Sequence, residues 1–260
     1  MVSVHLFQPI SLEQRSMGLM NEARVQHYRQ YAGEGAASGE CSYNGLRIYS
    51  LTGLHEFVAR TLQEELPRGS IVDLGAGTGA LSARCRDLGF RVTAVDAVVE
   101  NFRAPGVSVS EMDLDAEHWE VGGAPFDAVL AIEIIEHLEN PCGFLRACYA
   151  LLNPGGLAII TTPNIQNAVS KAMFCRSGRY QWFSETQSRE GHITPLSAWQ
   201  IHQYAEEAGF RVRRTNSFGD PFGAVRHWWR MRLFAKLIQL IDTLPKEQAG
   251  EILVTLLERR

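Results

Sequence analysis

Two carboxylates and an imidazole lie close together near the middle of the chain, in the segment AIEIIEHLEN. Glu133, Glu136 and His137 are spaced i, i+3, i+4, so a helical turn that begins at Glu133 would place all three on one face. Oxygen and nitrogen ligands in this combination suit Mg²⁺, Mn²⁺ or Zn²⁺. The spacing therefore predicts a divalent metal site, with Glu136 and His137 also as candidate catalytic residues.

A glycine-rich loop, VDLGAGTG, precedes this segment and falls between a predicted strand and a predicted helix. Gly75, Gly77 and Gly79 would let the backbone turn tightly and approach a ligand without a Cβ in the way. The loop also fits the dinucleotide pattern GxGxxA. Asp73 favours S-adenosylmethionine over a dinucleotide as the ligand, because its carboxylate would repel a pyrophosphate but attract the ammonium and sulfonium groups of S-adenosylmethionine.

Acidic residues follow two further predicted strands. Asp96 ends RVTAVD, where its carboxylate can accept hydrogen bonds from both hydroxyls of a ribose. Asp113, with Leu114 beside it, follows the next strand and would meet an adenine ring. Asp115 lies next to them, and either aspartate could instead be a solvated loop residue or a helix cap.

The elements that must position these residues alternate between strand and helix. Short β-branched runs predict strands at 70–75, 91–96, 126–133 and 157–164, with helix-like stretches between them. A helix is predicted before them, over 49–66, and another over 196–208, followed by strands at 209–218 and 251–260. Repeated β-α-β units predict a parallel sheet with helices on both faces, whose ligands bind at the carboxyl ends of the strands.

The segments VDLGAGTG, AVDA, MDLD and FDAVLAIEIIEHLENP, in this order, resemble the successive motifs of class I S-adenosylmethionine-dependent methyltransferases over roughly residues 49–212. The resemblance implies an α/β fold with a doubly wound, mostly parallel seven-stranded sheet. It also implies that the cofactor contacts the glycine loop, the acidic strand ends and Glu133.

The ExxEH element, followed by His192 in GHITPLSAW, resembles the branch that contains ubiquinone-pathway and small-RNA 2′-O-methyltransferases. This resemblance implies that His192 is a fourth metal ligand and that the metal lowers the pKa of an acceptor hydroxyl. The alternative is a metal-free enzyme in which His137 or His192 is the general base. His192 could also be only a helix-entry residue, with Thr194 as N-cap and Pro195 as the first helical residue.

Residues 1–45 are predicted to be a mobile lead-in or lid, and residues 46–260 the methyltransferase domain, with acceptor-side insertions at 164–195 and 220–248. The first insertion mixes aromatic residues with arginines, which would cover an acceptor ring and hold an acidic group, unless the segment is only a packed insertion. These residues are Phe174, Tyr180, Trp182 and Phe183, with Arg176, Arg179 and Arg189.

The second insertion contains RHWWRMRLFAKLIQLID, a basic amphipathic helix over Arg226–Ile241. Three occupants of its apolar face are open: a membrane interface, a second subunit in a homodimer, or its own domain. A membrane contact would place the enzyme at the inner face of the membrane, next to a lipid-linked acceptor.

The acceptor is inferred by analogy. Bacterial sugar and surface-glycan methyltransferases share a GHITP-like element before a helix that ends in EEAGF, which favours O-methylation of a sugar, glycan or other polyol. The alternative is the hydroxyl of a quinone or polyphenol. A small-RNA 2′-O-methyltransferase, an NAD-dependent oxidoreductase and an inactive binding subunit fit fewer features.

Composition limits the partners. The 260 residues include 45% hydrophobic and 21% charged residues, as in an ordinary globular protein, and the net charge of −4 gives no general attraction to DNA or RNA. The 5 cysteines are scattered without a CxxC pair, which is typical of reduced thiols. With no signal-like start, these features predict a cytoplasmic protein.

Overall fold

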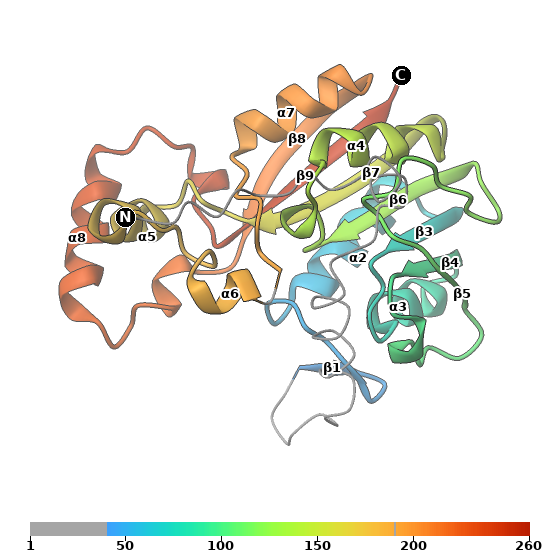
Figure 1. Ribbon diagram of the computed structural model, residues 1–260, viewed down its shortest axis with the longest axis horizontal. Helices are drawn as coiled ribbons and strands as arrows, with labels where there is room; N and C mark the ends of the chain where they lie inside the picture. The colour runs from blue at the N-terminus through green and yellow to red at the C-terminus, as the bar shows by residue number, and fades with distance from the viewer. Residues whose placement is uncertain (1–40, 190) are drawn as a thin grey trace, which may run out of the picture.

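A seven-stranded sheet forms the centre of the computed structural model, which describes residues 41–189 and 191–260 (Figure 1). The order across the sheet is β5 (Ser108–Glu111), β4 (Arg91–Asp96), β3 (Ser70–Leu74), β6 (Phe126–Ile132), β7 (Leu152–Pro163), β9 (Ile252–Arg259) and β8 (Phe210–Phe218). The predicted doubly wound, mostly parallel sheet of seven strands is confirmed.

The strand order reverses between β3 and β6, which are parallel neighbours. From β3 the chain builds outward through β4 to β5, and then returns to β6 and β7, all in parallel. β9 is antiparallel to both β7 and β8. In sheets of this kind the reversal point opens a crevice at the carboxyl ends of the strands, which is where a ligand is expected.

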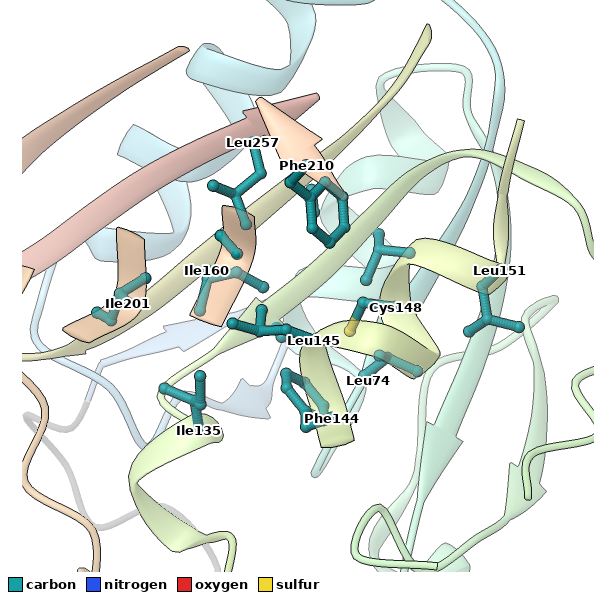
Figure 2. Close-up of a cluster of buried hydrophobic side chains, with 14 of the residues drawn as sticks. Leu74, Ile135, Phe144, Leu145, Cys148, Leu151, Ile160, Ile201, Phe210 and Leu257 are labelled. Carbon is teal, nitrogen blue, oxygen red and sulfur yellow. The ribbon is translucent and has the colours of Figure 1, made fainter. Parts of the chain in front are cut away.

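Helices cover both faces because the central strands are apolar on both sides. On one face α4 (Pro141–Ala150) and α7 (Ala198–Glu207) pack through Phe144, Leu145 and Ile201 against the sheet, as Figure 2 shows. On the other face α2 (Leu54–Glu65) and α3 (Ala80–Asp87) pack on Ile71 and its neighbours. α2 begins at Leu54, later than predicted, because Gly53 adopts a left-handed conformation and ends the preceding loop.

A two-stranded hairpin precedes α2 and is formed by β1 (Ser42–Tyr43) and β2 (Leu46–Arg47). Asn44 and Gly45 both have positive φ angles, 52° and 80°, as two-residue hairpin turns prefer. The Tyr43 hydroxyl donates to Asp87 on α3 at 2.8 Å. The last residues of the predicted lead-in or lid thus belong to this hairpin, and its residues 1–40 lie outside the described residues.

Two insertions extend from the carboxyl edge of the sheet. After β7 come α5 (Ala168–Ser177) and α6 (Glu185–Arg189), and after β8 come the 3₁₀ helix η4 (Pro221–Gly223), α8 (Trp229–Ile241) and the 3₁₀ helix η5 (Lys246–Gln248). α5 and α8 lie side by side and share a small apolar cluster (Figure 1). In the described part of the chain, no helix is long and apolar enough to cross a membrane.

Candidate active site

A cavity of about 620 Å³ opens at the carboxyl ends of the central strands, next to the point of strand reversal. Its wall brings together most of the predicted site residues, from segments far apart in the sequence. Those on the wall are Gly75, Gly77, Asp96, Asp113, Leu114, Glu133, His137 and His192. Asp73, Gly79 and Glu136 are predicted site residues that do not line it.

The glycine loop lies between β3 and α3, and its three glycines have φ angles between 55° and 83°. They differ in what surrounds them. A Cβ on Gly75 would lie 2.0 Å from Ile134 Cδ1, so this glycine permits close packing between the loops after β3 and β6. A Cβ on Gly77 would meet only Tyr49, at 3.8 Å, and would take up space in the cavity. Gly77 therefore leaves room for a ligand.

Asp73 is buried beneath the loop rather than exposed to a ligand. Its carboxylate accepts a hydrogen bond from the Ser82 hydroxyl on α3. Burial raises its pKa to about 6, and the nearby Asp96 carboxylate adds to the rise. Asp73 is thus a predicted cofactor-binding residue that does not line the cavity, and its carboxylate is bonded to Ser82 of α3.

Asp96 and Asp113 lie on the wall as predicted. Asp96 accepts hydrogen bonds from the backbone N–H groups of Gly77 at 2.7 Å and Val98 at 2.8 Å, and burial raises its pKa. Each of its oxygens keeps a lone pair for a ligand hydroxyl. Asp113 accepts from the N–H of Asp115, whereas Asp115 accepts from the N–H groups of Glu139 and Asn140 and so holds the start of α4.

Glu133 is the last residue before the chain turns away from β6, and it adopts a left-handed φ of 57°. Thr161 on β7 fixes it twice: the Thr161 hydroxyl accepts from the Glu133 N–H and donates to Oε1, each at 2.9 Å. Burial raises the pKa of this carboxyl to about 7. The helical turn comprises only Ile135–His137 (η3), so the prediction that Glu133, Glu136 and His137 share one helical face is wrong.

Glu136 is fully buried beside the cavity. Neither carboxylate oxygen has a hydrogen-bond partner among the described residues. Burial raises its pKa well above the usual range, and the neighbouring Glu133 carboxylate raises it further. A buried carboxylate without donors is costly unless a cation or a proton occupies it, so this side chain is a candidate cation ligand.

His192 reaches His137 from the first insertion. The ring centroids lie 4.7 Å apart at an angle of 87°, and Phe183 lies 5.7 Å from the His192 ring. The backbone N–H groups of Ile193 and Thr194 both donate to the Glu136 carbonyl, at 3.0 and 2.9 Å. The Thr194 hydroxyl donates to the Leu138 carbonyl at 2.6 Å. These bonds fix the segment after His192 to the turn that carries Glu136 and His137.

The alternative in which Thr194 is an N-cap and Pro195 is the first helical residue is wrong. α7 begins at Ala198, and its N-cap is Ser197, which forms a capping box with Gln200. Thr194 is instead bonded to Leu138, and Pro195 lies before the cap. His192 is therefore placed by its contacts with the β6 turn rather than by entry into a helix.

Three side chains lie close enough together to hold a metal ion: one ligand atom from each of Glu136, His137 and His192 lies within 4.8 Å of the others. Glu133 is not a member of this group, because its carboxylate points to Thr161. Of the four predicted metal ligands, three thus lie together. One carboxylate and two imidazoles suit a transition metal, or Mg²⁺, with further ligands from an acceptor.

The aromatic residues of the first insertion have different positions. Trp182 lines the cavity and Phe183 packs on His192, whereas Phe174 and Tyr180 stack on each other at 4.6 Å. Two of the arginines do not line the cavity: Arg176 lies over the Trp228 ring, and Arg179 pairs with Glu185. Of the predicted acceptor cover, the structure therefore brings Trp182 and Phe183 to the site.

The wall also contains residues that the sequence did not reveal, from the hairpin, from α2 and from the segment between them. Arg47, Tyr49 and His55 are among them. His55 is half-buried, and the loss of water around its ring, with the nearby Arg84 guanidinium, lowers its pKa to about 4. No local sequence signal identifies them, because their positions depend on how the hairpin and α2 pack against the rest of the fold.

Comparison with known proteins gives the family. A family model described as a methyltransferase domain matches residues 46–215, more than half of the chain. The ubiquinone biosynthesis O-methyltransferase of Caulobacter vibrioides is 42% identical over 103 residues, which are 36% of this chain and 41% of that protein. The protein of the same name from Maricaulis maris is 32% identical over 169 residues, 62% of this chain and 53% of that protein. The chain thus spans about half the length of these curated relatives.

Solved structures match over most of the chain. A SAM-dependent methyltransferase from Archaeoglobus fulgidus has a TM-score of 0.53 at 16% identity and covers 79% of this chain and 94% of its own. The 1,6-didemethyltoxoflavin-N1-methyltransferase of Burkholderia thailandensis, solved with S-adenosylhomocysteine, has a TM-score of 0.55 at 15% identity, with coverage of 98% and 93%. At these identities the likeness shows the fold.

Proposed function

Because this chain belongs to the methyltransferase-domain family and has the class I S-adenosylmethionine-dependent fold, we propose that it methylates a hydroxyl of a quinone precursor or related polyphenol. The curated relatives are named ubiquinone biosynthesis O-methyltransferases, which favours the aromatic alternative. The preference for a sugar or other polyol finds no support among the relatives, and the family membership also argues against a nicotinamide-dependent oxidoreductase.

The residues on the cavity wall fit S-adenosylmethionine. Gly77 leaves open the space that a side chain would fill, and the Asp96 carboxylate next to it can accept the two ribose hydroxyls. Asp113 and Leu114 lie on the same wall, where they can meet the adenine. When bound, this cofactor supplies a methyl group on a sulfonium.

The observation that carries the proposal is the group formed by Glu136, His137 and His192 at the end of the cavity beside Glu133. Methylation of a hydroxyl needs a group that takes the proton and a group that orients the oxygen. The two imidazoles can take the proton, since imidazole titrates near neutral pH. Trp182 and Phe183 lie beside them and can hold an aromatic acceptor.

A divalent cation fits the same group, because the buried oxygens of Glu136 have no hydrogen-bond donor of their own. Glu136, His137 and His192 would hold it. Such a cation would lower the pKa of an acceptor hydroxyl and orient it. With both histidines holding the cation, the hydroxyl proton would leave to water, and the oxygen would bond to the methyl carbon as the sulfonium became a thioether.

The test is methyl transfer from S-adenosylmethionine to a catechol, with a sugar diol as the comparison acceptor, in EDTA and with added Mg²⁺, Mn²⁺ or Zn²⁺. We expect transfer to the catechol that depends on a metal. The substitution Glu136→Gln should reduce the turnover at least tenfold, and leave the affinity for S-adenosylhomocysteine within about threefold.

Glu64→Gln is the matched control, because Glu64 is an exposed carboxylate on α2. It should not change either quantity. Turnover that is unaffected by EDTA would contradict a role for a metal and would leave a histidine as the general base. Transfer only to the sugar diol would contradict the proposal of an aromatic acceptor. A failure to bind S-adenosylhomocysteine would contradict the proposed activity altogether.

A further inference from the structure

α8 presents an apolar face to solvent. Trp229, Leu233, Leu237, Leu240 and Ile241 recur at intervals of three or four residues and therefore lie along one side of the helix. Their exposures are large for apolar side chains: 67% for Trp229, 81% for Leu240 and 82% for Ile241. Together these five residues form the outer face of α8.

The opposite side of α8 is already packed. Met231 and Ala235 are buried against Val169 and Ala172 of α5, with Ile238 beside them. Lys171 of α5 forms an ion pair with Asp242, at 2.6 Å, just after α8 ends. The helix is thus anchored to its own domain by one side, and the outer face is not needed for that contact. Exposed apolar patches of this extent mark interaction sites.

The charge around the outer face has one sign. From Pro221 to Ile241 the sequence contains no Asp or Glu, but it contains Arg226, Arg230, Arg232 and Lys236. Arginine guanidinium groups lie over the rings of the two tryptophans at the start of the helix. Arg176 Cζ lies 4.5 Å from the Trp228 centroid and Arg230 Cζ lies 5.3 Å from the Trp229 centroid. Basic residues with tryptophan beside an apolar stripe are typical of helices that lie in a membrane interface.

We propose that the outer face of α8 binds an anionic lipid surface. Insertion of the apolar side chains would remove them from water, while the flanking cations would meet lipid phosphates. Pairing of this face with a second copy of the chain is disfavoured, because a two-fold contact would bring the basic residues of both helices together with no acidic residue on either helix to offset them.

The insertion that carries α8 begins and ends next to the cavity. The chain leaves β8 after Phe218 and returns at Ile252, which lies opposite Phe218 and Pro163 in the sheet register. Ile252 and Pro163 both line the cavity. Buried bonds also tie the two insertions together, since Gln181 donates to Glu251 at 3.1 Å and Asn164 donates to the Gly250 carbonyl at 2.8 Å. The insertion that carries α8 is therefore connected at its base to segments that border the cavity.

The test is flotation of the full chain with two kinds of vesicle: phosphatidylcholine alone, and phosphatidylcholine with phosphatidylglycerol. We expect binding to the anionic vesicles that weakens with salt, and about tenfold weaker binding to the neutral ones. Leu233→Gln with Leu237→Gln should lower anionic binding about tenfold. Arg232→Gln with Lys236→Gln should lower it by a similar factor and weaken its salt dependence, since Arg226 and Arg230 remain.

Trp199→Gln is the matched control, since Trp199 on α7 has the same 67% exposure as Trp229 but lies on another helix. It should bind vesicles like the unchanged chain, and circular dichroism should show that every variant is folded. Equal binding to both vesicle types, or none, would overturn the proposal. A dimer that Leu233→Gln with Leu237→Gln dissociates, in a chain that ignores vesicles, would assign the outer face to a second copy.

Discussion

Glu133 and Glu136 are three residues apart, yet they have different environments. Thr161 donates to Glu133, which lines the cavity, whereas Glu136 is enclosed behind the cavity with no donor. The cause is the backbone: a left-handed residue at 133 turns the chain before η3 begins. Residue spacing predicts side-chain direction only where the dihedral angles are regular, so the spacing could identify these carboxylates but could not separate them.

Asp73 gives a prediction about pH and stability. Its pKa is about 6 in the fold against 3.8 ordinarily, so between these values the folded state binds more protons than the unfolded state. Above pH 6 the buried carboxylate is charged, which lowers the free energy of unfolding. This loss disappears as the pH falls toward 4, where the carboxyl is protonated in the fold. Asp73→Asn, which can still accept from Ser82, should thus stabilise the free protein by about 1–3 kcal/mol at pH 8 and by much less at pH 4.

Urea unfolding of both proteins at the two pH values measures this difference. A stability gain that is the same at pH 4 and pH 8 would show that the effect does not come from the charge of Asp73.

Thr194 gives a prediction about positioning. Its hydroxyl bond to Leu138 helps to hold His192 against His137. Thr194→Val keeps the shape but removes the donor, which should cost about 1 kcal/mol of stability and lower kcat about tenfold, with little change in S-adenosylhomocysteine affinity. Thr194→Ser keeps the donor and should restore kcat. Steady-state kinetics with calorimetry checks this, and equal kcat values for the Val and Ser variants would contradict it.

At the scale of elements, the strands and the glycine loop could be predicted because their signals are local. Buried strands read as continuous apolar runs, and a glycine loop between a strand and a helix has few other uses. The start of α7 could not be predicted as well, since Ser197 and Thr194 are both good N-caps and only the contact with Leu138 decides between them. Arg47, Tyr49 and His55 reach the cavity through tertiary placement of the hairpin and α2, which no local pattern records.

The contact between the loops after β3 and β6 predicts how substitutions at Gly75 and Ile134 change stability. Gly75→Ala would place a methyl 2.0 Å from Ile134 Cδ1 at a φ of 74°, and should destabilise the protein by about 2–4 kcal/mol. Adding Ile134→Ala should recover the steric part, which a double-mutant cycle would report as a coupling of about 1–2 kcal/mol.

Gly77→Ala is the contrasting variant, because its methyl would meet nothing closer than 3.8 Å. It should cost about 1 kcal/mol or less of stability but weaken S-adenosylhomocysteine binding. If the two alanine variants are equally unstable, the contact with Ile134 is not what makes Gly75 necessary.

At the scale of the molecule, the cavity wall draws on residues from Arg47 to Ile252. A ligand bound there would therefore stabilise the whole domain rather than one segment. S-adenosylhomocysteine at about one hundred times its Kd should add about 2.7 kcal/mol to the free energy of unfolding and raise Tm by roughly 5–10 °C. Calorimetry measures the shift, and NAD should produce none. A shift with NAD alone would contradict the assignment of the glycine loop.

Other expectations about the whole molecule remain predictions: its place in the cytoplasm or at the inner face of a membrane, its assembly as a homodimer, and the absence of nucleic-acid partners. They depend on surfaces and surroundings that a fold does not determine. Native mass spectrometry would test the homodimer directly.

The sheet register carries a consequence for how such proteins diversify. Pro163, Ile252 and Phe218 lie side by side across three strands, so the first insertion leaves the sheet at the same line of residues at which the second insertion leaves and re-enters it. A longer or shorter insertion would change the closure entropy by only about 0.6 kcal/mol per doubling of length. Either insertion can thus be replaced, in evolution or by design, while the strands and loops that bind the cofactor stay the same. The replaced insertion would give the enzyme a different acceptor.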